Sequence, residues 1–315
     1  MQQPYFDAKT LQRVKDFPVV IKALAQGFLH GIHTSQQRGV GIEFSQFRAY
    51  EPGDELSKID WKLFARSDKY FVREAERESD VNVWFVLDCS GSMLQQSSAN
   101  NRQSEASLPD DSTQLGRWNK LDYARYLIAT LSYLAQKQGD AVGLLTLSGE
   151  QTFQLPALPG NKHWQKLLLA LTKLKADGRI EQNKQVLKYL NAVQENALVV
   201  VVSDFHQQNL EVSTLLSQLK NSKTDVIAYH LDCDDEINFS YQGLVKFQDL
   251  ETKQSITVDA KDIKDDYLET KRQINQQLIT QCYKQDISYF TANIDQALDQ
   301  SLLEFLQARA RGNRR

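Results

Sequence analysis

The chain has 315 residues, of which 41% are hydrophobic and 24% are charged, and its formal net charge is −3. This balance is ordinary for a globular protein with one or two cores, and the lack of a basic excess argues against a nucleic-acid-binding protein. No apolar run reaches the roughly 18 residues of a membrane span, and the first residues lack the pattern of a secretion signal. Cys89, Cys233 and Cys282 show no zinc or disulfide spacing, so we expect a cytoplasmic protein that would need a partner for any membrane attachment.

Residues 1–79 are predicted to form a small amino-terminal α+β module. A helix is expected near residues 9–29, and it is followed from Gly31 to Glu78 by a segment dense in glycine, arginine and acidic residues. This segment has little periodicity and is too polar to build a large core alone. We therefore expect it to pack on the rest of the chain.

Residues 80–310 are predicted to form an α/β domain with a doubly wound, mostly parallel sheet. Strands are expected at residues 81–87, 142–147, 198–202, 226–231 and 287–290. Helices are expected near residues 121–135, 164–174, 186–193, 211–221, 262–283 and 295–309. Apolar strands that alternate with amphipathic helices indicate a parallel sheet covered on both faces.

Three further segments depart from this alternation. Residues 244–247 and 255–258 predict an additional hairpin, with its turn at residues 251–254. Residues 95–118 are polar and low in complexity, and a loop of this length is either mobile or functional, for example as a gate. Residues 311–315 are expected to form a short solvated basic tail.

Polar side chains follow two of the predicted strands. Asp88 ends the first strand, and Asp204 follows the strand at residues 198–202. Binding sites of doubly wound sheets lie beyond the carboxyl ends of the strands, so both carboxylates would share a crevice if these strands are neighbours. Ser90 and Ser92 occupy alternate positions after Asp88 and are expected to point the same way. Such oxygen ligands suit Mg²⁺, although the two serines would alternatively only cap the following segment.

The motif from Asp88 to Met93 (Asp-Cys-Ser-Gly-Ser-Met) resembles the metal-ion-dependent adhesion site of von Willebrand A domains. The resemblance implies that both serines ligate the metal directly, that the aspartates act through water, and that an acidic residue of a partner protein fills an open position. A threonine normally completes this site. In this sequence Ile180 stands in its place, and Glu181 or water would have to substitute for it.

Three longer stretches, residues 31–44, 47–55 and 59–74, look like the bacterial family called domain of unknown function 58 when taken together with the Asp88 motif. The resemblance extends from about residue 10 to the carboxyl end. Members of this family are often encoded beside MoxR-type AAA+ ATPases. The resemblance therefore implies a MoxR-type ATPase as partner in assembling, maturing or metallating other protein complexes, with the client protein unknown.

The charged residues of the amino-terminal segment allow two interpretations. In the first, arginines pair with acids and aromatic residues pack, so the segment is structural. In the second, arginines and glycine backbone form a docking or anion-binding surface, and the protein is a metal-free scaffold that docks through residues 31–78. The candidate partner-binding residues are Arg38, Glu43, Arg48, Asp54, Asp60, Trp61 and Arg66.

An enzyme is the remaining alternative. A hydrolase would use the Asp88 loop, with Cys89 as nucleophile and His206 or His230 as base, but we expect Cys89 to be buried and inert. The chain has no nucleotide-binding P-loop, so any energy would come from another protein. The acidic run from Asp232 to Glu236 is predicted to be a solvated loop, or else a weak Ca²⁺ site. The sequence thus favours a non-catalytic interaction module with no catalytic residue.

Overall fold

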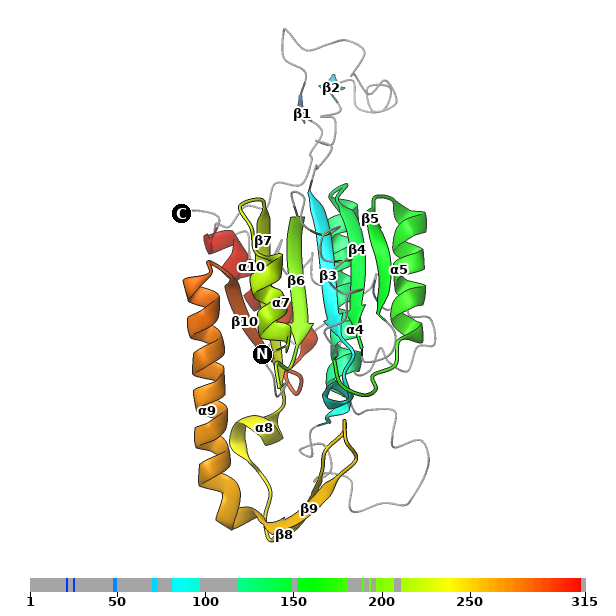
Figure 1. Ribbon diagram of the computed structural model, residues 1–315. Coiled ribbons are helices and arrows are strands. Elements are labelled where there is room, and N and C mark those ends of the chain that lie inside the picture. Colours follow the sequence, from blue (N-terminus) through cyan, green and yellow to red (C-terminus); the bar gives the residue numbers. More distant parts are fainter. Residues whose placement is uncertain are drawn as a thin grey trace, which may run out of the picture.

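The computed structural model describes residues 81–96, 118–148, 152–180, 197–206 and 211–312, together with 48–49, 70–72 and the single positions 21, 25, 189 and 193. Its centre is a six-stranded sheet with the strand order β10-β7-β6-β3-β4-β5 (Figure 1). In chain order the strands are β3 (Asn82–Asp88), β4 (Ala141–Leu147), β5 (Phe153–Leu158), β6 (Ala197–Ser203), β7 (Thr224–Asp232) and β10 (Ser288–Asn293). Only β5 is antiparallel to its neighbour, so the predicted doubly wound and mostly parallel sheet is confirmed.

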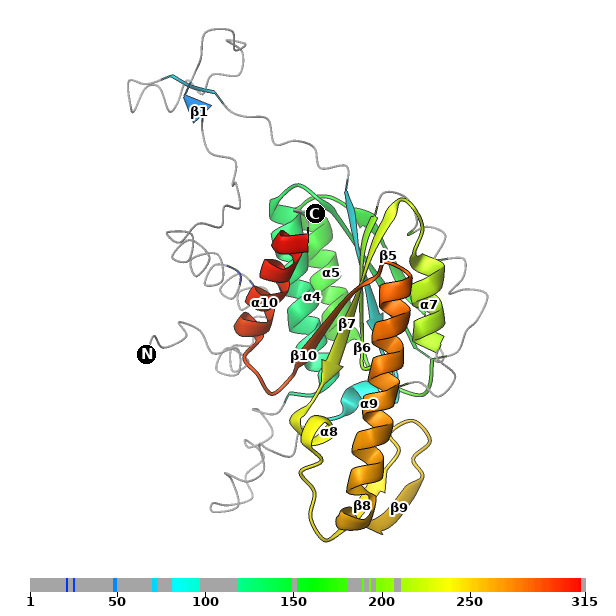
Figure 2. The same ribbon diagram turned by 90° about the vertical axis from the view of Figure 1, so that its left-hand side faces the viewer.

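Helices cover both faces of this sheet (Figure 2). The helices are α4 (Lys120–Lys137), α5 (Asn161–Lys173), α7 (Glu211–Leu219), α9 (Ala260–Lys284) and α10 (Leu298–Gly312). In the view along the sheet, α4, α5 and α10 lie on one side, and α7 and α9 lie on the other. None of the helices within the described ranges is long and apolar enough to cross a lipid bilayer.

The alternation of side chains along β3 explains the two layers. Val83, Phe85 and Leu87 join the apolar cluster under α4, α5 and α10, whereas Trp84 and Val86 join the cluster under α7 and α9. Successive residues of a strand point to opposite faces, so a strand without polar interruptions becomes buried on both sides. Ile21 and Ala25, both helical and fully buried, belong to the first of these clusters.

Local signals set both ends of α4. The Asn119 side chain accepts a hydrogen bond of 2.7 Å from the backbone N–H of Asp122, which caps the first turn. Gly139 follows the helix with a φ of 85°, a conformation that favours glycine. Strand β5 was not predicted, because Pro156 interrupts its sequence; it lies at the edge of the sheet, where a missing N–H is tolerated.

A predicted hairpin projects beyond the carboxyl ends of the parallel strands (Figure 1). It consists of β8 (Leu244–Gln248) and β9 (Ser255–Asp259), which pair antiparallel and lead directly into α9. A short helix, α8 (Asp234–Asn238), links β7 to this hairpin. Strands β1 (Arg48–Ala49) and β2 (Phe71–Val72) form a separate antiparallel pair. The hairpin therefore lies at the edge of the sheet where the sequence places the candidate site.

Candidate metal site at the carboxyl edge of the sheet

The two strands that carry the predicted carboxylates are neighbours. Strands β3 and β6 pair in parallel with Leu87 opposite Val202, so Asp88 and Asp204 emerge at the same edge of the sheet. Both side chains are fully buried. The condition under which both carboxylates share one crevice, that the two strands are neighbours, is therefore met.

The Asp88 carboxylate is held by a short network. Its Oδ1 accepts a hydrogen bond of 2.8 Å from the backbone N–H of Ser90, and its Oδ2 accepts one of 2.5 Å from the Ser203 hydroxyl. Burial, followed by the nearby charge of Asp204, raises the pKa of Asp88 to about 7. A cation at this edge would relieve the repulsion between these two buried carboxylates.

The two serines of the loop lie together. Ser90 Oγ is 3.0 Å from Ser92 Oγ; Ser90 is fully buried, whereas Ser92 is partly exposed. The loop continues into a 3-10 turn, η2 (Gly91–Leu94), for which Ser90 is the cap residue by position but donates or accepts no side-chain capping bond. The alternative in which the Ser90 side chain caps the following segment is therefore not observed at this turn.

A buried lysine that the sequence analysis missed completes the network. Lys120, at the start of α4, is fully buried and donates from Nζ to Asp204 Oδ2 over 3.1 Å and to Glu236 Oε1 over 2.7 Å. Burial alone would raise the pKa of Asp204, but the Lys120 ammonium outweighs it and holds that pKa well below its usual range. Lys120 itself keeps a raised pKa because the two carboxylates outweigh its own burial.

The loop after α5 forms the next wall of the site. Gly91 N donates to Gly178 O over 2.8 Å, and Asp177 N donates to Cys89 O over 3.0 Å. Ile180, which stands where the resemblance to von Willebrand A domains implies a threonine, is buried among apolar residues and offers no ligand atom. The proposed substitute Glu181 lies outside the described residues.

The turn of the hairpin closes the wall on the other side of Gly91. A Cβ atom at Gly91 would lie 2.7 Å from the carbonyl oxygen of Leu250, so only glycine allows the two backbones to approach this closely. Arg179 Nε pairs with Glu251 Oε2 at 3.1 Å, which ties the same turn to the loop after α5. The Asp88 loop is therefore enclosed by backbone from two distant parts of the chain.

The oxygen atoms of Asp88, Ser90, Ser92 and Asp204 fit a hard divalent cation. Two carboxylates and two hydroxyls converge, and oxygen-only sets of this kind suit Mg²⁺. Ser90 and Ser92 would be its direct ligands, and Asp88, whose two oxygens already accept hydrogen bonds, would act from behind them.

Of the residues proposed for a hydrolase, Cys89 is unsuitable as a nucleophile, and His206 lies beside the candidate site with its Nδ1 3.8 Å from Asp204 Oδ2. Cys89 is buried, and burial raises the pKa of its thiol far above the usual range. A thiolate is the reactive form of cysteine, so Cys89 is a structural residue of the core. His206 and His230 also lie close to Asp232.

The prediction of a solvated acidic loop at residues 232–236 is wrong. Asp232, Asp235 and Glu236 are all buried. Cys233 is the N-cap of α8, and the residues from Asp234 onward form the helix itself. Asp232 Oδ1 accepts a hydrogen bond of 2.6 Å from Lys271 Nζ, and Glu236 is bound by Lys120. Asp232 and Glu236 tolerate burial because lysines from two distant helices neutralise them.

The other predicted partner-binding residues are not placed by the structure. Arg38, Glu43, Asp54, Asp60, Trp61 and Arg66 lie outside the described residues, and of Arg48 only the backbone in β1 is described. Most of the 95–118 loop also lies outside them.

Comparisons with known proteins give a family and several distant similarities. A family model described as a protein of unknown function, DUF58, matches residues 46–277. The chain is similar to an uncharacterized protein of Mycobacterium tuberculosis, with 26% identity over 168 residues, or 53% of this chain and 47% of the relative, so it spans about half the length of the curated relatives it matches. Among solved structures it is similar to the conserved hypothetical protein BatB from Bacteroides thetaiotaomicron, with 14% identity, a TM-score of 0.42 and coverage of 72% of this chain and 99% of that one. It is also similar to the SpRpn10 VWA domain, with 8% identity, a TM-score of 0.38 and coverage of 70% and 93%.

Proposed function

The chain belongs to the DUF58 family, whose function is unknown, and from this premise we propose that it is a non-catalytic, von Willebrand A-like interaction module that docks through a bound Mg²⁺ ion. The observation that carries this proposal is the meeting of Asp88 and Asp204 at the ends of adjacent strands, with Ser90 and Ser92 beside each other in the loop between β3 and α4.

The cation would give this edge of the sheet an electrophilic contact point. Ser90 and Ser92 would hold Mg²⁺, and an open coordination position would accept a carboxylate from a partner protein. Ser92 is partly exposed while Ser90 is fully buried, which supports access from the Ser92 side. The ion would therefore bridge two proteins and not activate a substrate.

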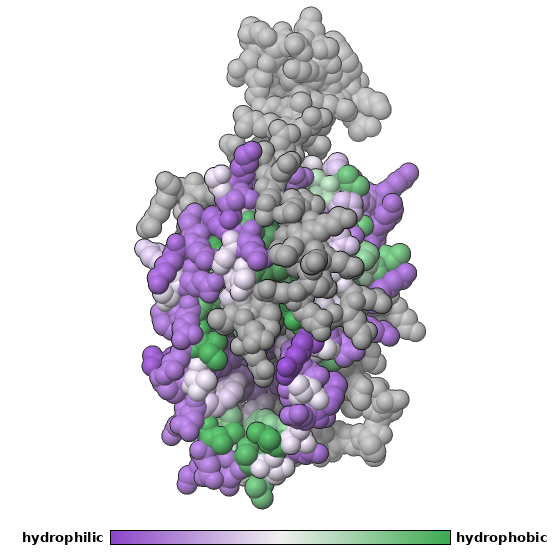
Figure 3. Space-filling model, viewed as in Figure 1, coloured by the Kyte–Doolittle hydropathy of each residue, from purple (hydrophilic) through white to green (hydrophobic). Residues whose placement is uncertain are grey.

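The hairpin beside the site supplies further contact surface. Leu244 is 80% exposed and Ile256 is 62% exposed, and Figure 3 shows apolar residues at the lower end of the molecule, over β8 and β9. Exposed apolar side chains next to a polar site are typical of protein–protein contacts. They favour a protein partner over a small molecule.

We propose a MoxR-type AAA+ ATPase as that partner, in the cytoplasm. The support is the family membership and the lack of a nucleotide-binding P-loop in this sequence, which leaves the energy source to another protein. The pair would assemble or mature further client proteins.

A second function, a metal-free scaffold docking through residues 31–78, is favoured by one observation. Lys120 already supplies a positive charge to Asp204, and Ile180 adds no ligand, so the edge is partly neutralised without an ion. The two functions differ in what the Ser92 hydroxyl does, since only the first needs it.

The first prediction separates them. The full chain is used to capture proteins from native cell extract in Mg²⁺ or in EDTA, and bound AAA+ ATPases are identified by mass spectrometry. We expect the wild-type chain to retain an AAA+ ATPase in Mg²⁺. Recovery of the ATPase should fall at least about tenfold in EDTA, which removes the ion, and in Ser92→Ala, which removes a direct metal ligand. The matched control is Ser222→Ala, an exposed serine before β7 at the opposite edge of the sheet. Equal recovery in all samples would favour the metal-free scaffold.

A further inference from the structure

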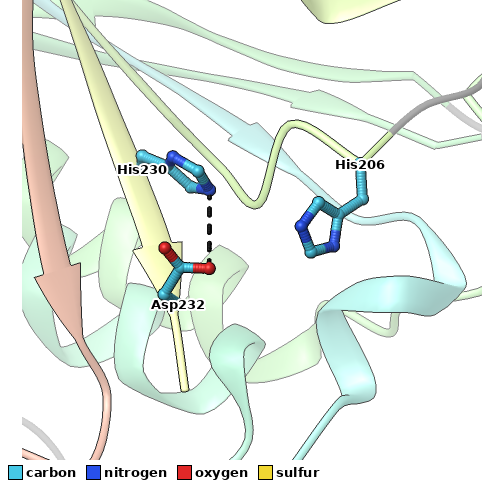
Figure 4. A group of neighbouring side chains, drawn as sticks. All are labelled: His206, His230 and Asp232. Atoms are coloured by element: carbon cyan, nitrogen blue, oxygen red, sulfur yellow. Dashed lines mark ion pairs between the residues drawn. The ribbon is translucent and has the colours of Figure 1, made fainter. Parts of the chain in front are cut away.

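A second group of metal-ligating side chains lies beside the oxygen site. His206, His230 and Asp232 come from the carboxyl ends of β6 and β7, and their ligand atoms all lie within 4.8 Å of one another (Figure 4). His230 Nε2 is 3.7 Å from Asp232 Oδ1. None of these three residues belongs to the set of Asp88, Ser90, Ser92 and Asp204.

One nitrogen of this group is buried without a partner. The His230 side chain is 1% exposed, and its Nδ1 lies 2.6 Å from the Tyr289 hydroxyl. Its Nε2 has no hydrogen-bond partner among the described residues, although it points toward Asp232. Buried polar atoms are normally satisfied, so a nitrogen in this position is suited to a ligand that the protein itself does not provide.

The hydrogen bond on the other side of the His230 ring suits a metal ligand. With Nδ1–H donating to the Tyr289 oxygen, His230 would present a lone pair at Nε2. This is the usual arrangement of a metal-bound histidine, whose other nitrogen is held by an outer hydrogen bond.

The surroundings admit a cation. Among the described residues, the three carboxylates of Asp204, Asp232 and Glu236 are paired with two ammonium groups, those of Lys120 and Lys271, which leaves excess negative charge. Lys271 Nζ binds Asp232 Oδ1 and would have to turn away when an ion arrives. A cavity of about 430 Å³, lined by His206, Glu236, Lys271 and Asn275 among others, lies on the His206 side of this group.

We propose that His206, His230 and Asp232 form a transition-metal site, separate from the Mg²⁺ site, that takes Zn²⁺ or an ion of similar preference. The choice of metal follows from the ligands, because imidazole nitrogen favours zinc and its neighbours whereas Mg²⁺ favours oxygen alone. The site goes beyond the docking function proposed above and does not depend on it.

The experiment uses Co²⁺ as a spectroscopic substitute for Zn²⁺, added to the untagged full chain while the visible absorption is recorded. We expect saturable binding that weakens at least about tenfold in His206→Gln, a partly exposed position that tolerates substitution better than buried His230. Ser92→Ala, at the oxygen site, and His163→Gln, a histidine of α5 whose Nε2 lies 2.9 Å from the Val142 carbonyl oxygen, should leave the Co²⁺ affinity unchanged.

Two results would overturn this proposal. Equal Co²⁺ affinity in wild type and His206→Gln would show that the histidines do not bind the ion. Loss of the Co²⁺ absorption in Ser92→Ala, with His206→Gln unaffected, would place the ion at the oxygen site. Circular dichroism of each variant checks that the fold is retained. If Mg²⁺-dependent docking fails, the Co²⁺ absorption and the circular dichroism still test the present site.

Discussion

Replacing Lys120 with methionine is expected to lower the free energy of unfolding by about 3–5 kcal/mol. The ammonium is fully buried and binds Asp204 and Glu236, both of which would be left as buried charges without their main partner. Removing one member of a buried ion pair costs far more than the pair contributes over an apolar replacement. Urea denaturation, followed by circular dichroism, measures the loss.

The matched control for this substitution is Lys166→Met, at an exposed lysine of α5. Surface substitutions of this kind change stability by about 0.5 kcal/mol or less. A further variant, Lys120→Met with Glu236→Gln, should regain part of the loss because one of the two orphaned charges is gone. A loss at Lys120 no larger than that at Lys166 would contradict the buried network.

Asp88→Asn is expected to stabilise the metal-free protein at pH 8. In wild type the pKa of about 7 lies above the ordinary value of 3.8, so between about pH 4 and 7 the folded protein binds more protons than the unfolded chain. The contribution of Asp88 to the free energy of unfolding therefore falls as the pH rises through this range. Above pH 7 its charge costs the folded state roughly 2–4 kcal/mol, which asparagine would avoid.

The test compares wild type and Asp88→Asn in EDTA at pH 4 and pH 8, so that all other titrating groups are shared. Asparagine can still accept the hydrogen bond from Ser90 N. The variant should have a higher free energy of unfolding than wild type at pH 8, and this difference should vanish near pH 4. Asp265→Asn, at an exposed position of α9, is the control and should change stability equally at both pH values. A variant that is equally destabilised at pH 4 and pH 8 would contradict a raised pKa at Asp88.

Much of this fold was predictable because its strands carry unbroken apolar runs. The five residues Leu198–Val202 can only be a strand buried on both faces, and such strands need helices on either side. Once β3 and β6 are adjacent, Asp88 and Asp204 must share an edge, since the last residues of parallel neighbours meet there. The oxygen-rich part of the site thus followed from the sequence on one condition, the adjacency of β3 and β6, which the structure supplies.

The charged part of the site was not predictable in this way. Lys120 is 84 residues from Asp204 and 116 residues from Glu236, and no local pattern links a lysine at a helix start to acids that distant. The acidic run at residues 232–236 has the composition of a solvated loop, and only the approach of α4 and α9 buries it. The His206 and His230 group was missed for the same reason, because its members converge only through the pairing of β6 with β7.

The central claim is that the serine loop binds a divalent cation, and calorimetric titration of the full chain with Mg²⁺ near neutral pH tests it most directly. We predict saturable binding of one ion to wild type and to Ser222→Ala, and binding weakened at least about tenfold in Ser90→Ala. Absence of saturable Mg²⁺ binding in wild type, or equal affinity in wild type and Ser90→Ala, would contradict the claim.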